Sequence, residues 1–363
     1  MINLFCVRPR RFNVGNATID AAMSGALRDV FGERCNLVPI PAIASDEEGS
    51  LSGLTAKTVY EMNLYGHGVV VGGGNLYENG QLDVDVNALC ALAAPLLLCS
   101  LSHGRIYDRR GRLTRRTDSM PVEHIVALHG RASASLARDD ATCAHLHELG
   151  LTGARLGGCP TLFVDELLSP SPPPRAAPGA LISIRNPQLM SMPHVHQARV
   201  HDQVRLIADA LEQEGFGPVR LLCHDKRDLG FASSFGDLEY VLPDDVWGYL
   251  GLLRAAPVVV TFRLHAFLPC LSFGTPAVNI SYDERSLSLV RTVGLGEWDI
   301  DLVKEHDAVE AVRDRLLRIE QLPALVDDAR PAWAQLRSTM RTTLEEFRER
   351  VDAYAAHAAP EPA

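Results

Sequence analysis

The residues with the clearest chemical potential are an arginine and a histidine two positions apart, Arg263 and His265. They follow an apolar run, residues 257–262, which predicts a buried parallel strand. If the extended conformation continues to His265, both side chains leave the same face of the chain. A guanidinium binds anions, and an imidazole beside it can act as a general acid or hold an anion. We therefore expect the pair to form part of a site for an anionic ligand.

Arg185 stands in a similar position. It follows the apolar residues 181–184, which predict another strand of the same domain. Ligands of open α/β sheets bind at the carboxyl ends of the strands, where Arg185 and Arg263 would lie. The position of Arg185 alone fits a surface arginine equally well. Together, the two arginines could bind a phosphate and a carboxylate of one small molecule.

Two loops rich in glycine and asparagine follow predicted strands in the first half of the chain. They comprise Asn13, Val14, Gly15 and Asn16 in one loop, and Gly72, Gly73, Gly74 and Asn75 in the other. Glycine permits positive φ angles and a close approach of backbone to a ligand. Neither loop matches a dinucleotide-binding or phosphate-loop fingerprint. Each fits a ligand-binding loop and a structural turn or helix cap about equally well.

Strand and helix patterns alternate in both halves of the chain, which predicts doubly wound parallel sheets. The expected strands cover residues 2–7, 68–71, 95–101, 180–184, 219–223 and 277–280, and the expected helices cover 17–31, 139–149, 201–214, 244–254 and 266–273. The fold class predicted by this order is α/β, with two Rossmann-like domains that face each other across a cleft.

A proline-rich segment divides the two halves. Residues 169–179 contain five prolines in eleven positions, a composition that continues neither a helix nor a central strand and predicts a stiff linker. We expect an N-terminal domain over residues 1–168 and a C-terminal domain over 180–330. Residues 331–363 predict one long helix with a frayed end.

Composition excludes several classes of protein. The chain has 363 residues and a formal charge of −10, which argues against nucleic acid as the main partner. It has neither a run of 18 apolar residues nor a convincing secretory signal, so we expect a cytoplasmic protein without a transmembrane segment. The eight scattered cysteines predict reduced thiols, and their spacing gives a metal site little support.

The order and spacing of these motifs resemble the polysaccharide pyruvyl transferase family over about residues 3–300. The motifs that carry the resemblance are Asn13-Val14-Gly15-Asn16, Gly72-Gly73-Gly74-Asn75, Arg138-Asp139 before a helix ending in Gly150, Gly158-Cys159-Pro160-Thr161, Ser183-Ile184-Arg185, Arg263-Leu264-His265-Ala266, Gly274-Thr275-Pro276, Tyr282 and Val293-Gly294-Leu295. The chain differs from the family pattern at Asn16, where the family usually has Asp, and at Arg285, near the place of a frequent Lys.

The resemblance implies a glycosyltransferase-B-like fold and transfer of a pyruvyl group from phosphoenolpyruvate to a sugar, usually as a cyclic ketal. It implies a small-molecule donor and a sugar-containing acceptor, with neither a cofactor nor a metal. Arg185 and Arg263 would bind the phosphate and carboxylate of the donor, while His265, as an imidazolium, would protonate its methylene carbon. Tyr282 and Arg285 would also bind substrate, and the two N-terminal loops would face the acceptor.

Two other functions fit the same architecture. A glycosyltransferase that uses a nucleotide-activated sugar would need a similar two-domain cleft. A non-catalytic relative could bind a sugar or an anion there. The predicted C-terminal helix could pack back across the domains or contribute to a homodimer.

Overall fold

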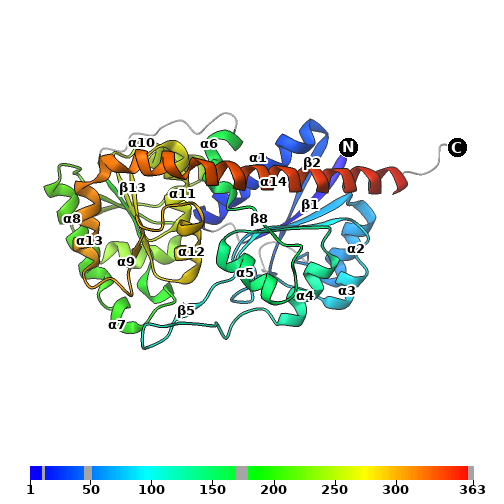
Figure 1. Cartoon of the computed structure of the whole chain (residues 1–363), viewed down its shortest axis with the longest axis horizontal. Helices are drawn as coiled ribbons and strands as arrows, with labels where there is room; N and C mark the ends of the chain where they lie inside the picture. Colours follow the sequence, from blue (N-terminus) through cyan, green and yellow to red (C-terminus); the bar gives the residue numbers. More distant parts are fainter. Residues whose placement is uncertain (10–12, 45–50, 169–178, 359–363) are drawn as a thin grey trace.

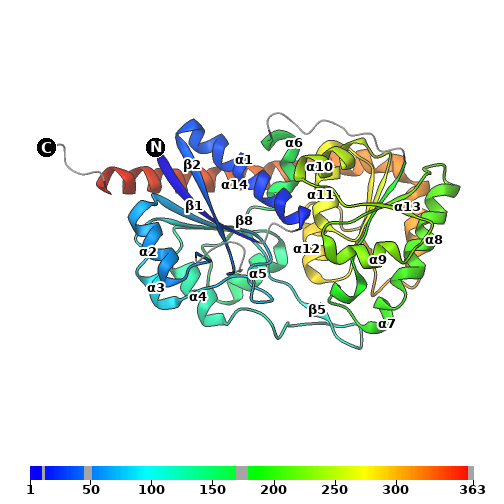
Figure 2. The same cartoon turned by 180° about the vertical axis from the view of Figure 1, so that it is seen from behind.

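The computed structural model of the chain describes residues 1–9, 13–44, 51–168 and 179–358 (Figure 1). Its backbone forms two six-stranded sheets in which all neighbouring strands are parallel. The two sheets lie side by side, each covered by helices on both faces (Figures 1 and 2). The predicted α/β class with two Rossmann-like domains is therefore confirmed. All but the last residue of the predicted proline-rich linker falls outside the described residues.

The strands of the N-terminal sheet lie in the order β2-β1-β3-β4-β7-β8. Their bounds are β1 Ile2–Arg8, β2 Cys35–Pro41, β3 Gly68–Gly74, β4 Leu96–Leu101, β7 Ala134–Ala137 and β8 Arg155–Leu156. Every residue of β3 and β4 is buried, as expected for central strands covered on both faces. The helices that follow them are α1 Val14–Phe31, α2 Ala56–Tyr65, α3 Val86–Cys90, α4 Val122–Arg131, α5 Asp140–Glu148 and α6 Val164–Leu167.

The C-terminal sheet repeats this plan in the order β11-β10-β9-β12-β13-β14. Its strands are β9 Leu181–Ser183, β10 Arg220–Leu222, β11 Glu239–Val241, β12 Val259–Thr261, β13 Ala277–Ser281 and β14 Ile300–Asp301. Its helices are α7 His194–Gln197, α8 Val200–Gln213, α9 Leu229–Ser233, α10 Val246–Ala255, α11 Leu264–Phe273, α12 Glu284–Thr292 and α13 Ala308–Leu317. One buried apolar cluster contains residues of both domains, so their cores are continuous.

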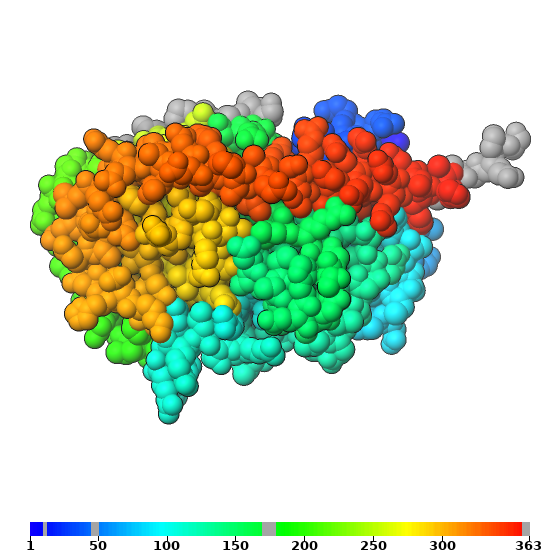
Figure 3. Space-filling view, viewed as in Figure 1, coloured from blue at the N-terminus to red at the C-terminus, as the bar shows by residue number. Residues whose placement is uncertain are grey.

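The last helix, α14 Leu322–Ala358, packs back across both domains, and its surface is continuous over them in Figure 3. Its buried side chains recur with helical spacing and include Trp333, Met340 and Phe347. Trp333 Nε1 donates to the carbonyl of Val293 at 2.7 Å, which fixes the helix to the C-terminal domain. The helix begins nine residues before the predicted start at 331, because the predicted first residue, Pro331, lies inside it.

A short hairpin that the sequence pattern did not predict extends from the N-terminal domain toward the C-terminal one. It consists of β5 Ile106–Tyr107 and β6 Leu113–Thr114. Tyr107 Oη donates to Asp301, and the backbone amide of Arg105 donates to Glu284 Oε2 at 2.8 Å. These bonds join the loop after β4 to α12 and β14, and so help to hold the carboxyl edges of the two sheets together.

No helix in the part of the chain that the structure describes has the length and apolarity needed to span a membrane. Among the same residues, no three His, Cys, Asp or Glu side chains are grouped as a metal site would require. All eight cysteines are free thiols.

Candidate active site

A polar cavity of about 260 Å³ lies between the two domains. From the N-terminal domain it is lined by Asn13, Asn16, Asn75, Gln81 and Arg138, and from the C-terminal domain by Arg185, His224, Arg227, Phe262, Arg263, Leu264, His265, Tyr282, Asp283, Arg285 and Ser286. Most of these residues come directly after strands, at the carboxyl edges of the two sheets, as expected for a ligand site of this architecture. Eight of the residues predicted from the sequence meet here: Asn13, Asn16, Asn75, Arg185, Arg263, His265, Tyr282 and Arg285.

Arg263 is held in place by the residues behind it. Its Nε donates to the carbonyl of Ile184 at 3.1 Å, and its Nη2 pairs with Asp228 Oδ2 at 2.5 Å. Asp228 is fully buried and Arg263 is 9% exposed, so the guanidinium has a fixed orientation at the cavity wall. The chain leaves β12 in an extended conformation at Arg263 but enters α11 at Leu264. The strand therefore ends earlier than the sequence suggested, and His265 reaches the cavity from the first turn of the helix.

His265 is neutral in this structure at neutral pH. Burial, followed by the positive charges of Arg138, Arg263 and Arg285, lowers the pKa of His265 to about 3. Its Nε2 is buried and has no hydrogen-bond partner among the described residues, while its backbone carbonyl accepts from Tyr249 Oη at 2.7 Å. Burial, and to a lesser extent the nearby guanidinium groups, therefore disfavour the imidazolium in the ligand-free protein. The expectation that His265 acts as an imidazolium concerns the donor complex and stays a prediction.

The positive charge of Arg185 is compensated less by neighbouring groups than that of Arg263. Its Nε and Nη2 donate to the carbonyl of Leu189 at 3.3 and 3.2 Å, and no carboxylate of the described residues forms an ion pair with it. Burial, and then the charge of Arg263, lowers the pKa of Arg185. This half-buried cation is the kind of group that an anionic ligand would stabilise.

The lining also includes residues that were not predicted as site residues from the sequence, among them Arg138 and His224. Arg138 follows β7, whose small residues, ASLA, lack the β-branched run that marks a strand, so its strand-end position was hidden. His224 follows β10, and the rule that selected Arg185 would have found it. His224 is buried, and its Nε2 lies 2.8 Å from Ser183 Oγ and 3.2 Å from Tyr249 Oη.

The first N-terminal loop serves the structure of the site more than it offers donors to a ligand. Asn13 caps α1, accepting from the amides of Gly15 and Asn16 at 3.0 and 3.3 Å, and its Nδ2 donates to Asp225 at 2.6 Å. Gly15 does not line the cavity. A Cβ at Gly15 would lie 3.2 Å from the Cβ of His265, so this glycine makes room for the histidine.

In the second loop the glycines serve helix packing and the asparagine lines the cavity. Gly73 and Gly74 adopt φ angles of +89° and +79° and do not line the cavity. A Cβ on Gly73 would come within 2.3 Å of Ile19 in α1, so the glycine lets that helix approach β3 closely. Asn75, the next residue, lies in the cavity wall.

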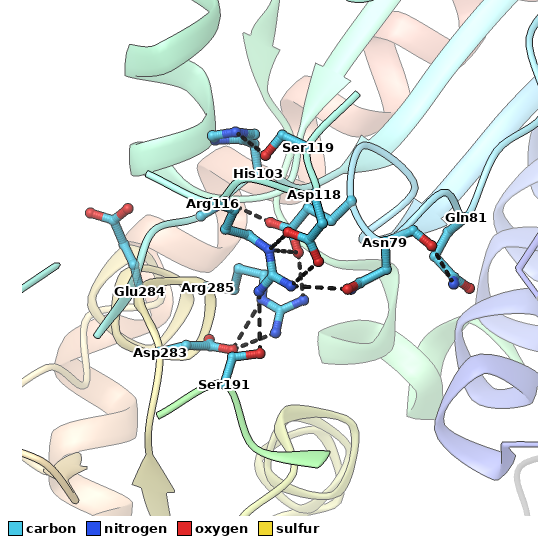
Figure 4. A network of polar contacts seen from close by, with 12 residues as sticks. Asn79, Gln81, His103, Arg116, Asp118, Ser119, Ser191, Asp283, Glu284 and Arg285 are labelled. Atoms are coloured by element: carbon cyan, nitrogen blue, oxygen red, sulfur yellow. Dashed lines mark hydrogen bonds and ion pairs between the residues drawn. The ribbon is translucent and has the colours of Figure 1, made fainter. Parts of the chain in front are cut away.

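Arg285 lines the cavity, but its charge is committed to a network between the domains (Figure 4). It donates to Glu78 Oε2 at 2.7 Å and to Asp283 on its own helix cap. Glu78 is fully buried, and it also accepts from the amide of Gly104 at 2.9 Å. Burial raises the pKa of Glu78, and Arg285 and then Arg116 act in the opposite direction. Because Glu78 and Arg285 come from different domains, the network fixes the two walls of the cavity relative to each other.

Among the residues that the structure describes, the cavity lining has no free carboxylate. Asp283 is the one acidic side chain that these residues contribute to the lining, and Arg285 binds it. At Asn16 the sequence has an amide, which can donate or accept a hydrogen bond but cannot take a proton. The groups described here can therefore bind an anion and exchange a proton through His265, and they include no free carboxylate that could act as a base.

The solved structures to which the chain is similar share its architecture. Over 100% of this chain and 99% of the other, it superposes on the S. aureus MnaA–UDP co-structure with a TM-score of 0.58 and 13% identity. Over 87% of this chain and 93% of the other, it superposes on Methanocaldococcus jannaschii UDP-GlcNAc 2-epimerase in complex with UDP-GlcNAc and UDP, with a TM-score of 0.54 and 11% identity. At this identity the likeness shows the fold alone, which is glycosyltransferase-B-like.

Similarity in sequence says more about the family of this chain than similarity in fold does. A segment of 75 residues is 35% identical to the amylovoran biosynthesis protein AmsJ of Erwinia amylovora, and it spans 19% of this chain and 18% of that relative. The family model for polysaccharide pyruvyl transferase matches residues 13–284, a range that contains the cavity-lining residues from Asn13 to Asp283. The chain belongs to the polysaccharide pyruvyl transferase family.

Proposed function

We propose that the protein transfers the pyruvyl group of phosphoenolpyruvate to a sugar-containing acceptor, with release of phosphate and formation of a cyclic ketal. The observation that carries the proposal is the small cavity between the domains, in which the guanidinium groups of Arg185 and Arg263 lie beside the imidazole of His265. Family membership supports the same reaction class. A phosphate and a carboxylate on one small donor match two arginines in a confined space.

The chemistry needs one proton at carbon and one at the leaving group. Protonation of the methylene carbon of phosphoenolpyruvate makes its central carbon electrophilic. A sugar hydroxyl adds to that carbon, the carbon–oxygen bond to phosphate breaks, and a second hydroxyl closes the ketal. Of the two hydroxyl protons, one replaces the proton delivered to the methyl carbon and the other leaves with phosphate. Preorganised guanidinium groups would stabilise the departing phosphate.

His265 is the proton donor in this proposal, although it is neutral without ligand. The negative charge of the donor would offset the nearby arginines and let the imidazole take up a proton. His265 could then give that proton to the methylene carbon and recover one from the attacking hydroxyl. No carboxylate is needed for this cycle, which is consistent with the amide at Asn16.

A nucleotide-sugar glycosyltransferase is the second candidate, and the UDP named for two similar structures is the observation in its favour. The cavity volume favours the smaller donor. About 260 Å³ is below the roughly 300–1,000 Å³ typical of sites for drug-sized ligands, whereas a nucleotide sugar is a large ligand.

Thermal stabilisation by candidate donors would test the proposal. A ligand that binds only the folded state raises the melting temperature, and the stabilisation grows with the logarithm of its concentration above its dissociation constant. We expect phosphoenolpyruvate to stabilise the wild-type protein and UDP-GlcNAc to have little effect. Stabilisation by UDP-GlcNAc alone would refute the proposal in favour of the second candidate. Phosphate release from phosphoenolpyruvate in the presence of sugar acceptors would then separate an enzyme from a non-catalytic binding protein.

A further inference from the structure

We infer that residues 104–116, which contain the β5–β6 hairpin, are a docking surface for an anionic glycan, a polysaccharide chain that carries carboxylate groups. We call this segment the arginine hairpin. It lies outside the cavity lining and projects from the lower edge of the molecule (Figures 1 and 3). That the docked glycan is the acceptor rests on the proposed function, whereas the docking itself does not.

The arginine hairpin is opposite in charge to the chain as a whole. It contains six arginines and one aspartate, a formal charge of +5, in a chain whose formal net charge is −10. The arginines are Arg105, Arg109, Arg110, Arg112, Arg115 and Arg116. Lys304 adds a cation beside them, with its Nζ 5.8 Å from the centre of the Tyr107 ring. An acidic protein that concentrates positive charge in one short segment attracts anions to that segment.

Three of the six arginines have a structural role, because carboxylates of the protein bind them. Their partners are Glu284 for Arg105, Asp108 for Arg112, and Asp118 and Glu78 for Arg116. Arg116 and its partner Asp118 belong to the network between the domains (Figure 4). These three arginines hold the hairpin in place and leave little charge for a ligand.

A tight turn presents two further arginines, Arg109 and Arg110, to solvent at the tip of the hairpin. Asp108 Oδ1 accepts from the amides of Arg110 and Arg112 at 2.8 and 2.9 Å. The amide of Gly111, whose φ is +67°, donates to the carbonyl of Asp108 at 2.9 Å. These bonds define the backbone of the tip without help from the side chains of Arg109 and Arg110.

Arg109, Arg110 and Arg115 are the arginines available to a ligand. All three are exposed, and the ion pairs of the described residues involve none of them. Arg115 follows Arg110 by five residues, which corresponds to about 16 Å along an extended strand. A single phosphate group can bind at one end of this row, whereas an extended polymer with repeated negative charges can bind along its whole length.

The surface of the arginine hairpin favours a glycan over a membrane or duplex DNA. Its apolar side chains, Ile106, Tyr107 and Leu113, are buried or half-buried, so the described residues of the hairpin offer no exposed apolar group for insertion into a bilayer. A membrane or a duplex is also broad enough to face the acidic remainder of the chain, whereas a single polysaccharide chain contacts the hairpin alone. Guanidinium groups bind carboxylates through paired hydrogen bonds.

Both ends of the arginine hairpin are joined to the wall of the cavity. At its start, Arg105 Nε donates to Glu284 Oε1 at 2.9 Å, and Glu284 lies between two lining residues in the sequence. At its end, Arg116 Nε lies 3.7 Å from Glu78 Oε2, the oxygen that also accepts from Arg285 in the cavity wall. A glycan bound along the hairpin would therefore lie beside the cavity, where its hydroxyl groups could meet the donor.

The test measures binding of fluorescently labelled oligogalacturonate, a glycan with repeated carboxylates, by anisotropy. The hairpin variant is Arg109→Gln/Arg110→Gln/Arg115→Gln. The control variant is Arg28→Gln/Arg34→Gln/Arg350→Gln, which removes three exposed arginines elsewhere and so loses the same charge. We expect the hairpin variant to bind at least about tenfold more weakly than wild type, and the control to stay within about twofold of wild type. Equal affinities of the two variants would overturn the inference.

Two further ligands test the class of partner. A neutral dextran oligosaccharide of the same length should bind much more weakly than oligogalacturonate, and equal binding would overturn the assignment of an anionic ligand. Vesicles that contain phosphatidylglycerol should bind weakly to the wild type. Tight vesicle binding that the hairpin substitutions abolish would overturn the glycan in favour of a membrane surface. Oligogalacturonate binding should also weaken as salt screens the arginines, and an affinity independent of salt would contradict the inference.

Phosphoenolpyruvate separates this inference from the proposed function. It should raise the melting temperature of the hairpin variant as much as that of wild type, because the substitutions lie outside the cavity. Absence of this effect in the wild type would refute the proposed function, while the oligogalacturonate titrations would still decide whether the hairpin docks an anionic glycan.

Discussion

Raising the pH should weaken the binding of phosphoenolpyruvate, because in the proposed mechanism the donor and a proton on His265 bind together. In the ligand-free protein the pKa of His265 is about 3. Neutral pH therefore lies about four units above this pKa. Each unit corresponds to about 1.4 kcal/mol, so protonating His265 at pH 7 costs about 5 kcal/mol in the ligand-free protein. One negative charge about 4 Å away contributes about 4 kcal/mol at an effective dielectric constant near 20. The donor carries roughly three such charges, so it can drive the protonation.

The sign follows from linkage between ligand and proton. Because donor binding would raise the pKa of His265 above its ligand-free value, the complex binds more protons than the free protein. The apparent affinity should then fall by up to about tenfold for each unit of rising pH, between the ligand-free pKa and that of the complex. At neutral pH, binding should take up about one proton at this histidine.

Calorimetric titrations in buffers of different ionisation enthalpy measure this uptake directly. The control is His265→Gln, which binds through the same arginines but cannot take up the proton. Ionisation of the donor's own phosphate, with a pKa near 6, contributes equally to both titrations and cancels in the comparison. Equal proton uptake by wild type and His265→Gln would refute the reasoning and remove His265 as the proton donor.

Three further predictions follow from the packing of the site. Arg185→Gln should weaken donor binding with little loss of stability. Arg263→Ala should also destabilise the fold, on the order of 3–5 kcal/mol, because it leaves the buried carboxylate of Asp228 unpaired. Equal melting temperatures of the two variants would contradict this. Gly15→Ala should lower turnover, because the added Cβ crowds His265. The control is Gly130→Ala, whose Cβ would have nothing within 4 Å and which should keep wild-type turnover. Equal rates for the two variants would show that the close approach of residue 15 to His265 is unimportant. Burial lowers the pKa of His129 to about 4, so stability present above about pH 6.5 should decline as the pH falls toward 4, and urea titrations should show a smaller decline in His129→Gln.

The sequence predicted the parts of the site that depend on single strands. The apolar run before Arg263 and the one before Arg185 each predicted a buried strand, and both arginines lie at the cavity that the carboxyl edges of the sheets form. This worked because the direction of a parallel strand determines where the residues after it lie. Arg138 appeared in a family motif but was not predicted as a site residue, because the residues of β7 lack β-branched side chains and no pattern marked their strand.

Properties that depend on partners distant in sequence could not be predicted in this way. Gly73 has a positive φ, which fits a ligand loop, yet the group that approaches it is Ile19 of α1. Arg285 stands in the site motif, yet Glu78, from the other domain, occupies its guanidinium. A glycine or an arginine in a motif indicates that something comes close, and the three-dimensional fold decides whether that is a ligand or the protein itself.

The distribution of charge in the cavity shows which arginines are available to a ligand. Three arginines of the cavity lining each form an ion pair with a carboxylate that also accepts other hydrogen bonds from the protein. They are Arg227, Arg263 and Arg285. On the opposite walls, Arg138 lies 3.5 Å from Asp139 Oδ2 without a hydrogen bond to it, and Arg185 has no carboxylate partner among the described residues. The paired arginines shape the cavity, while burial and then the charges of Arg138, Arg263 and Arg285 lower the pKa of His265. We therefore expect an anionic donor that reaches both walls to offset these positive charges and to raise the pKa of His265.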